Sequence, residues 1–175
     1  MKLEWLRSGR SIAGVLAFCH LTNNYGFTGD WFINDIKDLE VSPAFKWFKH
    51  CFAPEAVFID VADGRYAKHI APYSVGDNLI FNLVGINDLN KTSKGKLMVK
   101  LLDSEGKVVV QNHSEVEITP YGKTYIPTLL KLPEKSGGYL IVAEYYPDHR
   151  TNPVISRRYI KIGNSDTYSF YEAGM

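Results

Sequence analysis

The residues of this chain that come closest to a catalytic pattern are carboxylates in one short stretch, Asp30, Asp35, Asp38 and Glu40. Acid–base cleavage of a glycosidic bond needs two carboxyl groups on rigid elements, held about 5 Å or about 6.5–9.5 Å apart. These carboxylates instead lie in a polar stretch that contains glycine and asparagine, which is typical of a surface loop. The sequence therefore favours solvated loop charges at these positions, and we assign no catalytic residue.

Other motifs that carry chemistry are absent from the sequence. It contains no glycine-rich phosphate loop and no nucleophile elbow. No cysteine or histidine pair has the spacing of a zinc site, and the histidines are scattered along the chain: His20, His50, His69, His113 and His149. We therefore predict no metal site and no cofactor.

Three tyrosines, Tyr145, Tyr146 and Tyr159, lie on predicted strands towards the end of the chain. Aromatic rings that lie side by side on a sheet could stack against a sugar ring. Aromatic residues in strands more often pack against neighbours across the sheet. The sequence favours the second interpretation and leaves the first open.

The composition excludes several classes of protein. Hydrophobic residues make up 45% of the 175 positions and aromatic residues 13%, which suits a packed core and excludes a disordered chain. The net charge is +1, from 20 basic and 19 acidic residues, so bulk electrostatics favour neither nucleic acid nor an anionic membrane as a partner. No apolar run reaches the length of about 18 residues that a membrane span needs.

The N-terminal region has some features of a secretory signal. Basic residues precede an apolar run that ends at Cys19. However, Glu4 and Trp5 interrupt the basic part, and Phe18 stands where cleavage needs a small residue. We therefore expect no signal peptide. Cys19 and Cys51 are too few for a disulfide framework, so the sequence leaves the compartment open.

The N-terminal third of the chain predicts elements of mixed type. Residues 12–21 are apolar almost without alternation, which is typical of a strand buried on both faces, although a short buried helix fits the same pattern. Residues 22–41 predict a loop. Residues 42–52 predict a helix, because Ser42 can cap the first turn and Pro43 stands where no N–H is needed. Apolar residues recur three or four positions apart along this helix and give it one apolar face.

Short alternating segments separated by turn signals follow from residue 54 onward. Strands are expected at 56–61, 66–70, 78–86, 96–102, 107–111, 115–119, 125–132, 139–146 and 154–162. Such a series is typical of a mainly β fold, an immunoglobulin-like antiparallel β-sandwich over 54–163. The polar and aromatic residues 164–175 predict a loosely held tail.

The order of these features resembles the C-terminal end of the family 2 glycoside hydrolases, which include β-galactosidases, β-glucuronidases and β-mannosidases. Gly14–Asn23 is similar to the last strand of that family's catalytic (β/α)8 barrel, and Pro43–Pro54 is similar to the helix that follows it. Gly138–Tyr145 and Ile155–Ile162 are similar to the end of the family's terminal sandwich. The resemblance implies that residues 1–53 are a short αβα remnant of the barrel placed before the sandwich.

The resemblance also implies roles for particular residues. In that family the barrel-end strand and the loop after it border the sugar, so His20, Asn23, Asn24 and Trp31 are expected to line the substrate. Cys19 stands where the family usually carries a tryptophan. The family's catalytic glutamates lie on earlier barrel strands, and nothing in this chain matches them. No catalytic residue is therefore carried over.

The resemblance predicts a non-catalytic C-terminal region of a β-glycosidase, whose sandwich braces the catalytic barrel. The missing barrel is the expected partner. Without it, residues 12–21 would expose an apolar surface, so we expect them to fold back on the sandwich or to pair with a second copy in a homodimer. A stand-alone immunoglobulin-like module that binds a carbohydrate or a protein is the alternative. An enzyme of unrelated mechanism, built on the carboxylates of residues 30–40, is a third hypothesis.

Overall fold

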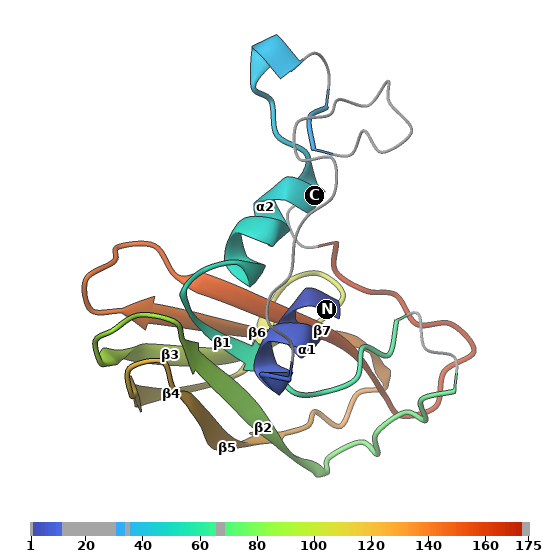
Figure 1. The fold of residues 1–175 in the computed structure, drawn as a ribbon. Helices are drawn as coiled ribbons and strands as arrows, with labels where there is room; N and C mark the ends of the chain where they lie inside the picture. Colours follow the sequence, from blue (N-terminus) through green and yellow to red (C-terminus); the bar gives the residue numbers. More distant parts are fainter. Residues whose placement is uncertain (1, 12–30, 34–35, 66–68, 173–175) are drawn as a thin grey trace.

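The computed structural model describes residues 2–11, 31–33, 36–65 and 69–172 (Figure 1). Its elements are α1 (Lys2–Gly9), the 3-10 helix η1 (Ile36–Asp38), α2 (Pro43–Cys51), β1 (Glu55–Ile59), β2 (Asn78–Asn87), β3 (Ser93–Leu102), β4 (Val108–Ile118), β5 (Lys123–Lys131), β6 (Gly137–Pro147) and β7 (Val154–Ile162). The strand predicted at 12–21 lies outside the described residues. The predicted division into a barrel-end segment, a sandwich and a tail stays a prediction.

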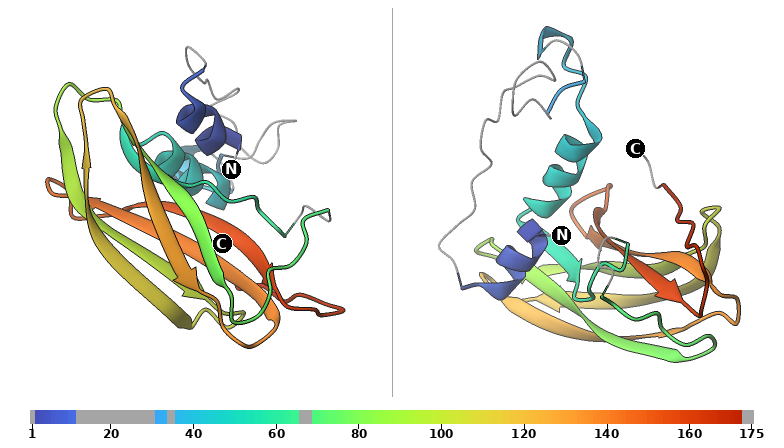
Figure 2. Two further views of the ribbon diagram at one scale, coloured as in Figure 1. Left: turned by 90° about the horizontal axis from the view of Figure 1, so that it is seen from below. Right: turned by 90° about the vertical axis from the view of Figure 1, so that its right-hand side faces the viewer.

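The strands form two sheets that face each other (Figure 2). One sheet has the order β1-β2-β5, and the other has the order β4-β3-β6-β7. Neighbouring strands within each sheet are antiparallel. The prediction of an immunoglobulin-like antiparallel β-sandwich is therefore confirmed.

Alternation of apolar and polar residues explains why the strands face one another in this way. Along β3 every second residue from Ser93 to Leu101 is buried, and the residues between them are more exposed. The same alternation along the first half of β2 turns Leu79, Phe81 and Leu83 into the space between the sheets. Because side chains in a strand alternate between its two faces, each sheet contributes one apolar face to a common core.

The strand bounds differ from the prediction in two places. The strands expected at 107–111 and 115–119 are one strand, β4, because Asn112, His113 and Ser114 continue the pairing with β3. These polar residues are tolerated because β4 is an edge strand with much of its surface exposed. Of the strand expected at 66–70, residues 69 and 70 lie in a turn, and 66–68 lie outside the described residues.

The end of the chain contacts the sandwich through Phe170 and Tyr171, whereas residues 164–167 are exposed, and the predicted tail at 164–175 stays a prediction. Phe170 and Tyr171 cover a buried cluster on the outer face of the four-stranded sheet, made of Leu140, Val142 and Tyr159. The Tyr159 hydroxyl donates to the carbonyl of Tyr171 over 3.2 Å. This cover explains why β6 is buried along both faces although it lies in an antiparallel sheet.

Helix α1 is attached to the sandwich by a buried ion pair. Glu4 and Arg158 of β7 form this pair, and each side chain is only 5% exposed. Arg158 also donates from Nε to the carbonyl of Val61, over 3.1 Å. A buried charge is tolerated only when it is paired and hydrogen-bonded, so the pair fixes the position of α1 on the sheet.

Two further arginines join the same helix to the β2–β3 turn. Arg7 donates to the carbonyl of Cys51 and to the carboxylate of Asp88, the latter over 2.6 Å. Arg10 forms an ion pair with Asp88 over 2.8 Å and donates to the carbonyls of Asn87 and Gly122. A helix of 8 residues is marginal on its own in water, so these contacts are what keep α1 helical.

We predict that Glu4→Ala destabilises the protein by about 3–5 kcal/mol, because it leaves the Arg158 guanidinium buried and unpaired. Unfolding in urea, followed by circular dichroism, measures the change. Glu117→Ala is the matched control, since it removes an exposed ion pair with Lys94 of 3.0 Å and should cost no more than about 1 kcal/mol. Equal losses in the two variants would contradict the assignment of the buried pair.

Candidate functional site

The segment before β1 forms an aromatic arm, which we define as residues 31–33 and 36–52. Its helix, α2, begins as the sequence predicts: the hydroxyl of Ser42 accepts from the N–H of Phe45 over 3.3 Å, and Pro43 occupies the first turn. An antiparallel bridge between Phe32 and Val41 closes the turn that precedes the helix. Figure 1 shows the arm standing away from the sandwich, with η1 at its far end.

Trp31 lies inside the aromatic arm. Its side chain is 7% exposed and packs edge-on against Phe45 and Phe48 of α2, with ring centroids 5.8 Å and 4.5 Å away. The backbone carbonyl of Trp31 accepts from the N–H of Ser42 over 2.8 Å, which holds the ring against the helix. Its predicted contact with a sugar stays a prediction.

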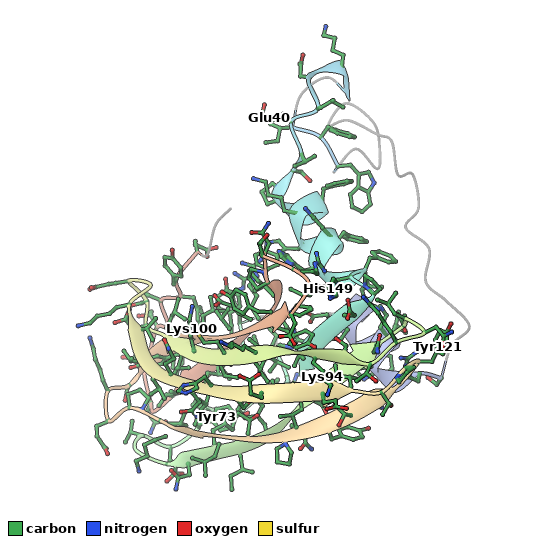
Figure 3. All side chains as sticks on the ribbon, turned by 90° about the vertical axis from the view of Figure 1, so that its left-hand side faces the viewer. Glu40, Tyr73, Lys94, Lys100, Tyr121 and His149 are labelled. Carbon is green, nitrogen blue, oxygen red and sulfur yellow. The ribbon has the colours of Figure 1, made fainter. Side chains whose placement is uncertain are left out.

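The other predicted site residues are placed only in part. His20, Asn23, Asn24, Asp30 and Asp35 lie outside the described residues. Asp38 and Glu40 are exposed, and Figure 3 shows Glu40 at the outer end of the aromatic arm, well away from the strands. Exposure of this kind agrees with solvated loop charges and does not supply the rigid setting that a catalytic carboxylate needs.

The base of the aromatic arm is bound to β7. His50 accepts the N–H of Ile155 at its Nδ1 atom over 3.2 Å, and the guanidinium of Arg157 lies 3.1 Å from the ring centroid of Trp47. Burial, followed by the charges of Lys49, Arg150 and Arg157, lowers the pKa of His50, which keeps the ring neutral and able to accept. These contacts fix the direction in which the arm leaves the sandwich.

Cys51 ends α2 and is buried beside α1. Burial raises the pKa of its thiol to about 11. Because the thiolate is the reactive form, this cysteine is inert at neutral pH. It packs as a small apolar residue at the junction of the two helices.

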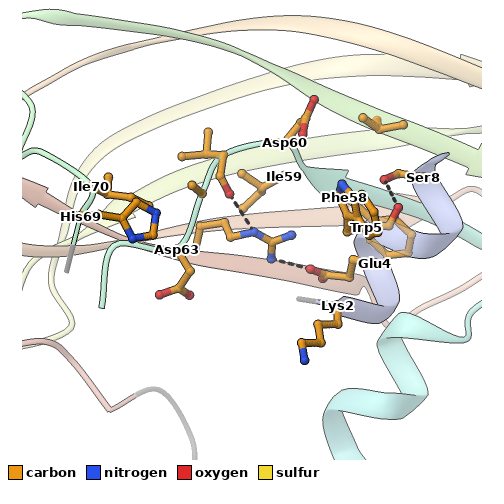
Figure 4. A pocket seen from close by; sticks show the side chains of 14 residues that line it. Lys2, Glu4, Trp5, Ser8, Phe58, Ile59, Asp60, Asp63, His69 and Ile70 are labelled. Carbon is orange, nitrogen blue, oxygen red and sulfur yellow. Dashed lines mark hydrogen bonds and ion pairs between the residues drawn. The ribbon is translucent and has the colours of Figure 1, made fainter. Parts of the chain in front are cut away.

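A cavity of about 420 Å³ lies between α1 and the end of β1 (Figure 4). Lys2, Glu4, Trp5 and Ser8 of α1 line one side of it, and β1 with the loop that follows lines another. His69, Ile70, Val84 and Arg158 complete the lining. The sequence gives no signal for this cavity, since its walls come from segments that meet only through the tertiary fold.

The walls of the cavity differ in chemical character. Trp5 stands at one side with 69% of its surface exposed, beside the buried ring of Phe58. Figure 4 shows His69 and Asp63 on the opposite side and Asp60 above them. The Glu4 carboxylate, paired with Arg158, forms part of the lining. The cavity therefore combines an aromatic surface with carboxylates, an imidazole and a buried guanidinium.

The three strand tyrosines do not form a stacking platform. Tyr145 is fully buried and its hydroxyl lies 2.7 Å from that of Ser93, whereas Tyr146 points to the opposite face of β6. Tyr159 is covered by the guanidinium of Arg65, 4.0 Å from its ring centroid, and by Phe170. Core packing accounts for Tyr145 and cover by the tail for Tyr159, as the favoured interpretation predicts, whereas the Tyr146 hydroxyl donates to Glu144 over 3.0 Å.

The described residues contain no group of three or more histidine, cysteine, aspartate or glutamate side chains that could hold a metal ion. Within the same part of the chain, no helix is long and apolar enough to cross a membrane.

No protein-family model and no curated protein sequence matches this chain. Similar solved structures include a CARDB domain from Pyrococcus furiosus (13% identity, TM-score 0.44), covering 64% of this chain and 91% of that one. A β-glucosidase from Listeria innocua in complex with glucose (11%, TM-score 0.46) covers 65% of this chain, which spans 16% of the enzyme. A family 2 β-glucuronidase (14%, TM-score 0.41) covers 61% of this chain, which spans 11% of that enzyme. TM-scores below 0.5 at such identities support no inference about function.

We predict that acid weakens the protein through His50. Its pKa is lower in the folded state than the ordinary value of 6.5, so the unfolded chain takes up the proton first and stability falls as the pH drops below about 6.5. His50→Gln should flatten the dependence of the unfolding free energy on pH between about 6.5 and 5.

The matched control is His113→Gln, because His113 is exposed on the edge strand β4. Urea unfolding at a series of pH values measures both variants. A pH dependence that is unchanged by His50→Gln would contradict the assigned hydrogen bond to Ile155.

Proposed function

We propose that this chain is a non-catalytic accessory region of a larger β-glycosidase, in which it braces the catalytic barrel. The observation that carries the proposal is the aromatic arm, which projects from the sandwich and exposes apolar side chains. Leu39 is 72% exposed, and Ile33 and Phe52 are each 40% exposed. Exposed apolar residues that share one projecting element are typical of an interface with another body.

The way in which the arm is held supports the same proposal. α2 has 9 residues, too few for a stable isolated helix, and its base is fixed by His50, Trp47 and Cys51. A projecting helix fixed in this way presents a preformed surface to a partner and loses little conformational entropy on docking. The resemblance to family 2 glycoside hydrolases assigns α2 to the last helix of the barrel, whose partner would be the rest of that barrel.

The proposed role includes no bond cleavage by this chain. General acid and nucleophile must both reach the glycosidic bond, and the two described carboxylates of the predicted cluster, Asp38 and Glu40, are exposed on the arm. Under the proposal, the larger enzyme supplies the catalytic glutamates. His20, Asn23, Asn24 and Trp31 would border its sugar site, as the resemblance implies.

The size of the native polypeptide tests this proposal. An antibody raised against the chain should detect, in extract of the source cells, a single band several times larger than 19.8 kDa. Material captured by the antibody should hydrolyse a nitrophenyl β-glycoside, whereas the isolated chain should not. A band at 19.8 kDa without associated glycosidase activity would overturn the proposal and favour a stand-alone binding module.

Substitutions in that larger protein test the interface itself. Leu39→Asp places a charge in the proposed contact and should lower the melting temperature of the catalytic part by several degrees. Ile80→Asp is the control, because Ile80 is 73% exposed on β2, away from the arm. Equal effects of the two substitutions would count against docking through the arm.

A further inference from the structure

We propose that the cavity between α1 and the end of β1 binds a neutral saccharide, with Trp5 as the stacking surface. The proposal concerns a site on this chain alone. It does not rest on the proposed role of the arm, which uses different residues, and it stands whether or not a catalytic barrel is attached.

The dimensions of the cavity suit a small ligand. Its volume of about 420 Å³ falls within the range of about 300–1,000 Å³ that ligand sites occupy. Ligand sites combine apolar walls with a few polar groups that fix orientation. Here Phe58, Ile59 and Val84 supply apolar lining, and the polar groups come from α1, from the loop after β1 and from β7.

Trp5 is the aromatic residue that best fits a ligand-stacking role in this cavity. The bonds made by Glu4, Arg7 and Arg10 hold α1 against the sandwich, and they leave the neighbouring indole of Trp5 at the cavity wall with 69% of its surface exposed. An exposed indole beside a cavity offers a flat apolar face and an N–H donor. The C–H face of a pyranose ring is a flat apolar partner of matching size.

Arg158 supplies buried donors to the same cavity. The residue is 4% exposed, and its Nε and Nη1 atoms donate to Val61, Glu4 and the carbonyl of Arg157. A guanidinium has five N–H donors, and the Nη2 atom makes no hydrogen bond to a described residue. A ligand oxygen in the cavity could therefore accept a hydrogen bond from Nη2.

The carboxylates of the cavity need hydrogen-bond donors on the ligand, whereas the guanidinium of Arg158 needs acceptors. Asp60 and Asp63 line the loop after β1, and an ionised carboxylate can only accept hydrogen bonds. Glu4 and Arg158 neutralise each other in their ion pair, so Asp60 and Asp63, partly offset by Lys2, are the charges that a ligand meets, and they would repel an anion. A neutral polyol both donates and accepts through each hydroxyl, so it can satisfy both sets of groups.

These requirements select one class of ligand. Trp5 would pack against an apolar face of the ligand. The guanidinium of Arg158 would donate to ligand oxygens, and the two aspartates would accept from ligand hydroxyls. A sugar ring carries all three on one rigid frame, which limits the entropy lost on binding. The volume leaves room for a ligand larger than one ring, and we therefore expect a disaccharide to bind more tightly than a monosaccharide.

Titration calorimetry with the intact chain tests the proposal. The probes are methyl β-glucoside, cellobiose, lactose, maltose and mannobiose, each up to about 10 mM, and at least one disaccharide should bind with a dissociation constant of about 1 mM or below. Trp5→Ala should weaken binding about tenfold, and Asp63→Asn about threefold to tenfold. Melting temperatures of the variants confirm that each remains folded.

Tyr125→Ala is the matched control, because Tyr125 is an aromatic residue on β5 that is 56% exposed and lies outside the cavity. Its saccharide affinity should equal that of the unmodified chain. The proposal is overturned if no saccharide binds, if Trp5→Ala binds as tightly as the unmodified chain, or if free phenylalanine binds in place of the sugars. None of these results alters the expected size of the native polypeptide, so the two proposals fail independently.

Discussion

The buried ion pair between Glu4 and Arg158 is the interaction on which the arrangement around the sandwich depends. It joins the first helix to the last strand across 154 positions of sequence, and both partners are withdrawn from water. Burying two charges is favourable only with good geometry and further hydrogen bonds, which Val61 and the Arg157 carbonyl provide. Once α1 is held there, Arg7 reaches the end of α2, Trp5 is placed at the rim, and the cavity gains its second wall.

The sandwich itself follows from short-range patterns in the sequence. Alternation along β3 predicts which residues enter the core, and the structure turns Leu97, Val99 and Leu101 inward. Ser42 and Pro43 predict the start of α2 because capping is a local effect between neighbours. The strands and α2 could be predicted in this way, since period and capping act over a few residues.

The candidate site could not be predicted, because its residues meet only through the tertiary fold. Nothing in the spacing of Glu4 and Arg158 indicates that they pair. From the sequence alone, Trp5 cannot be distinguished from a tryptophan that packs in the core. The contact of Phe170 and Tyr171 with β6 could not be predicted either: the continuous apolar run Tyr139–Ala143 indicates a strand buried on both faces, but not which segment covers the outer one. The sugar contact predicted for Trp31 rests on the resemblance alone. The packing of its ring against Phe45 and Phe48 does not test that contact.

Amide hydrogen exchange in the intact chain tests most directly whether the ion pair fixes α1 to the sandwich. The amides of residues 6–9 have partners within α1, and they should be protected well beyond the rates of a free peptide. In Arg158→Met, this protection should be lost while the amides of β3 and β6 stay protected. Exchange of residues 6–9 at free-peptide rates in the unmodified protein would contradict the account, since α1 would then be neither docked nor able to form the wall of a site.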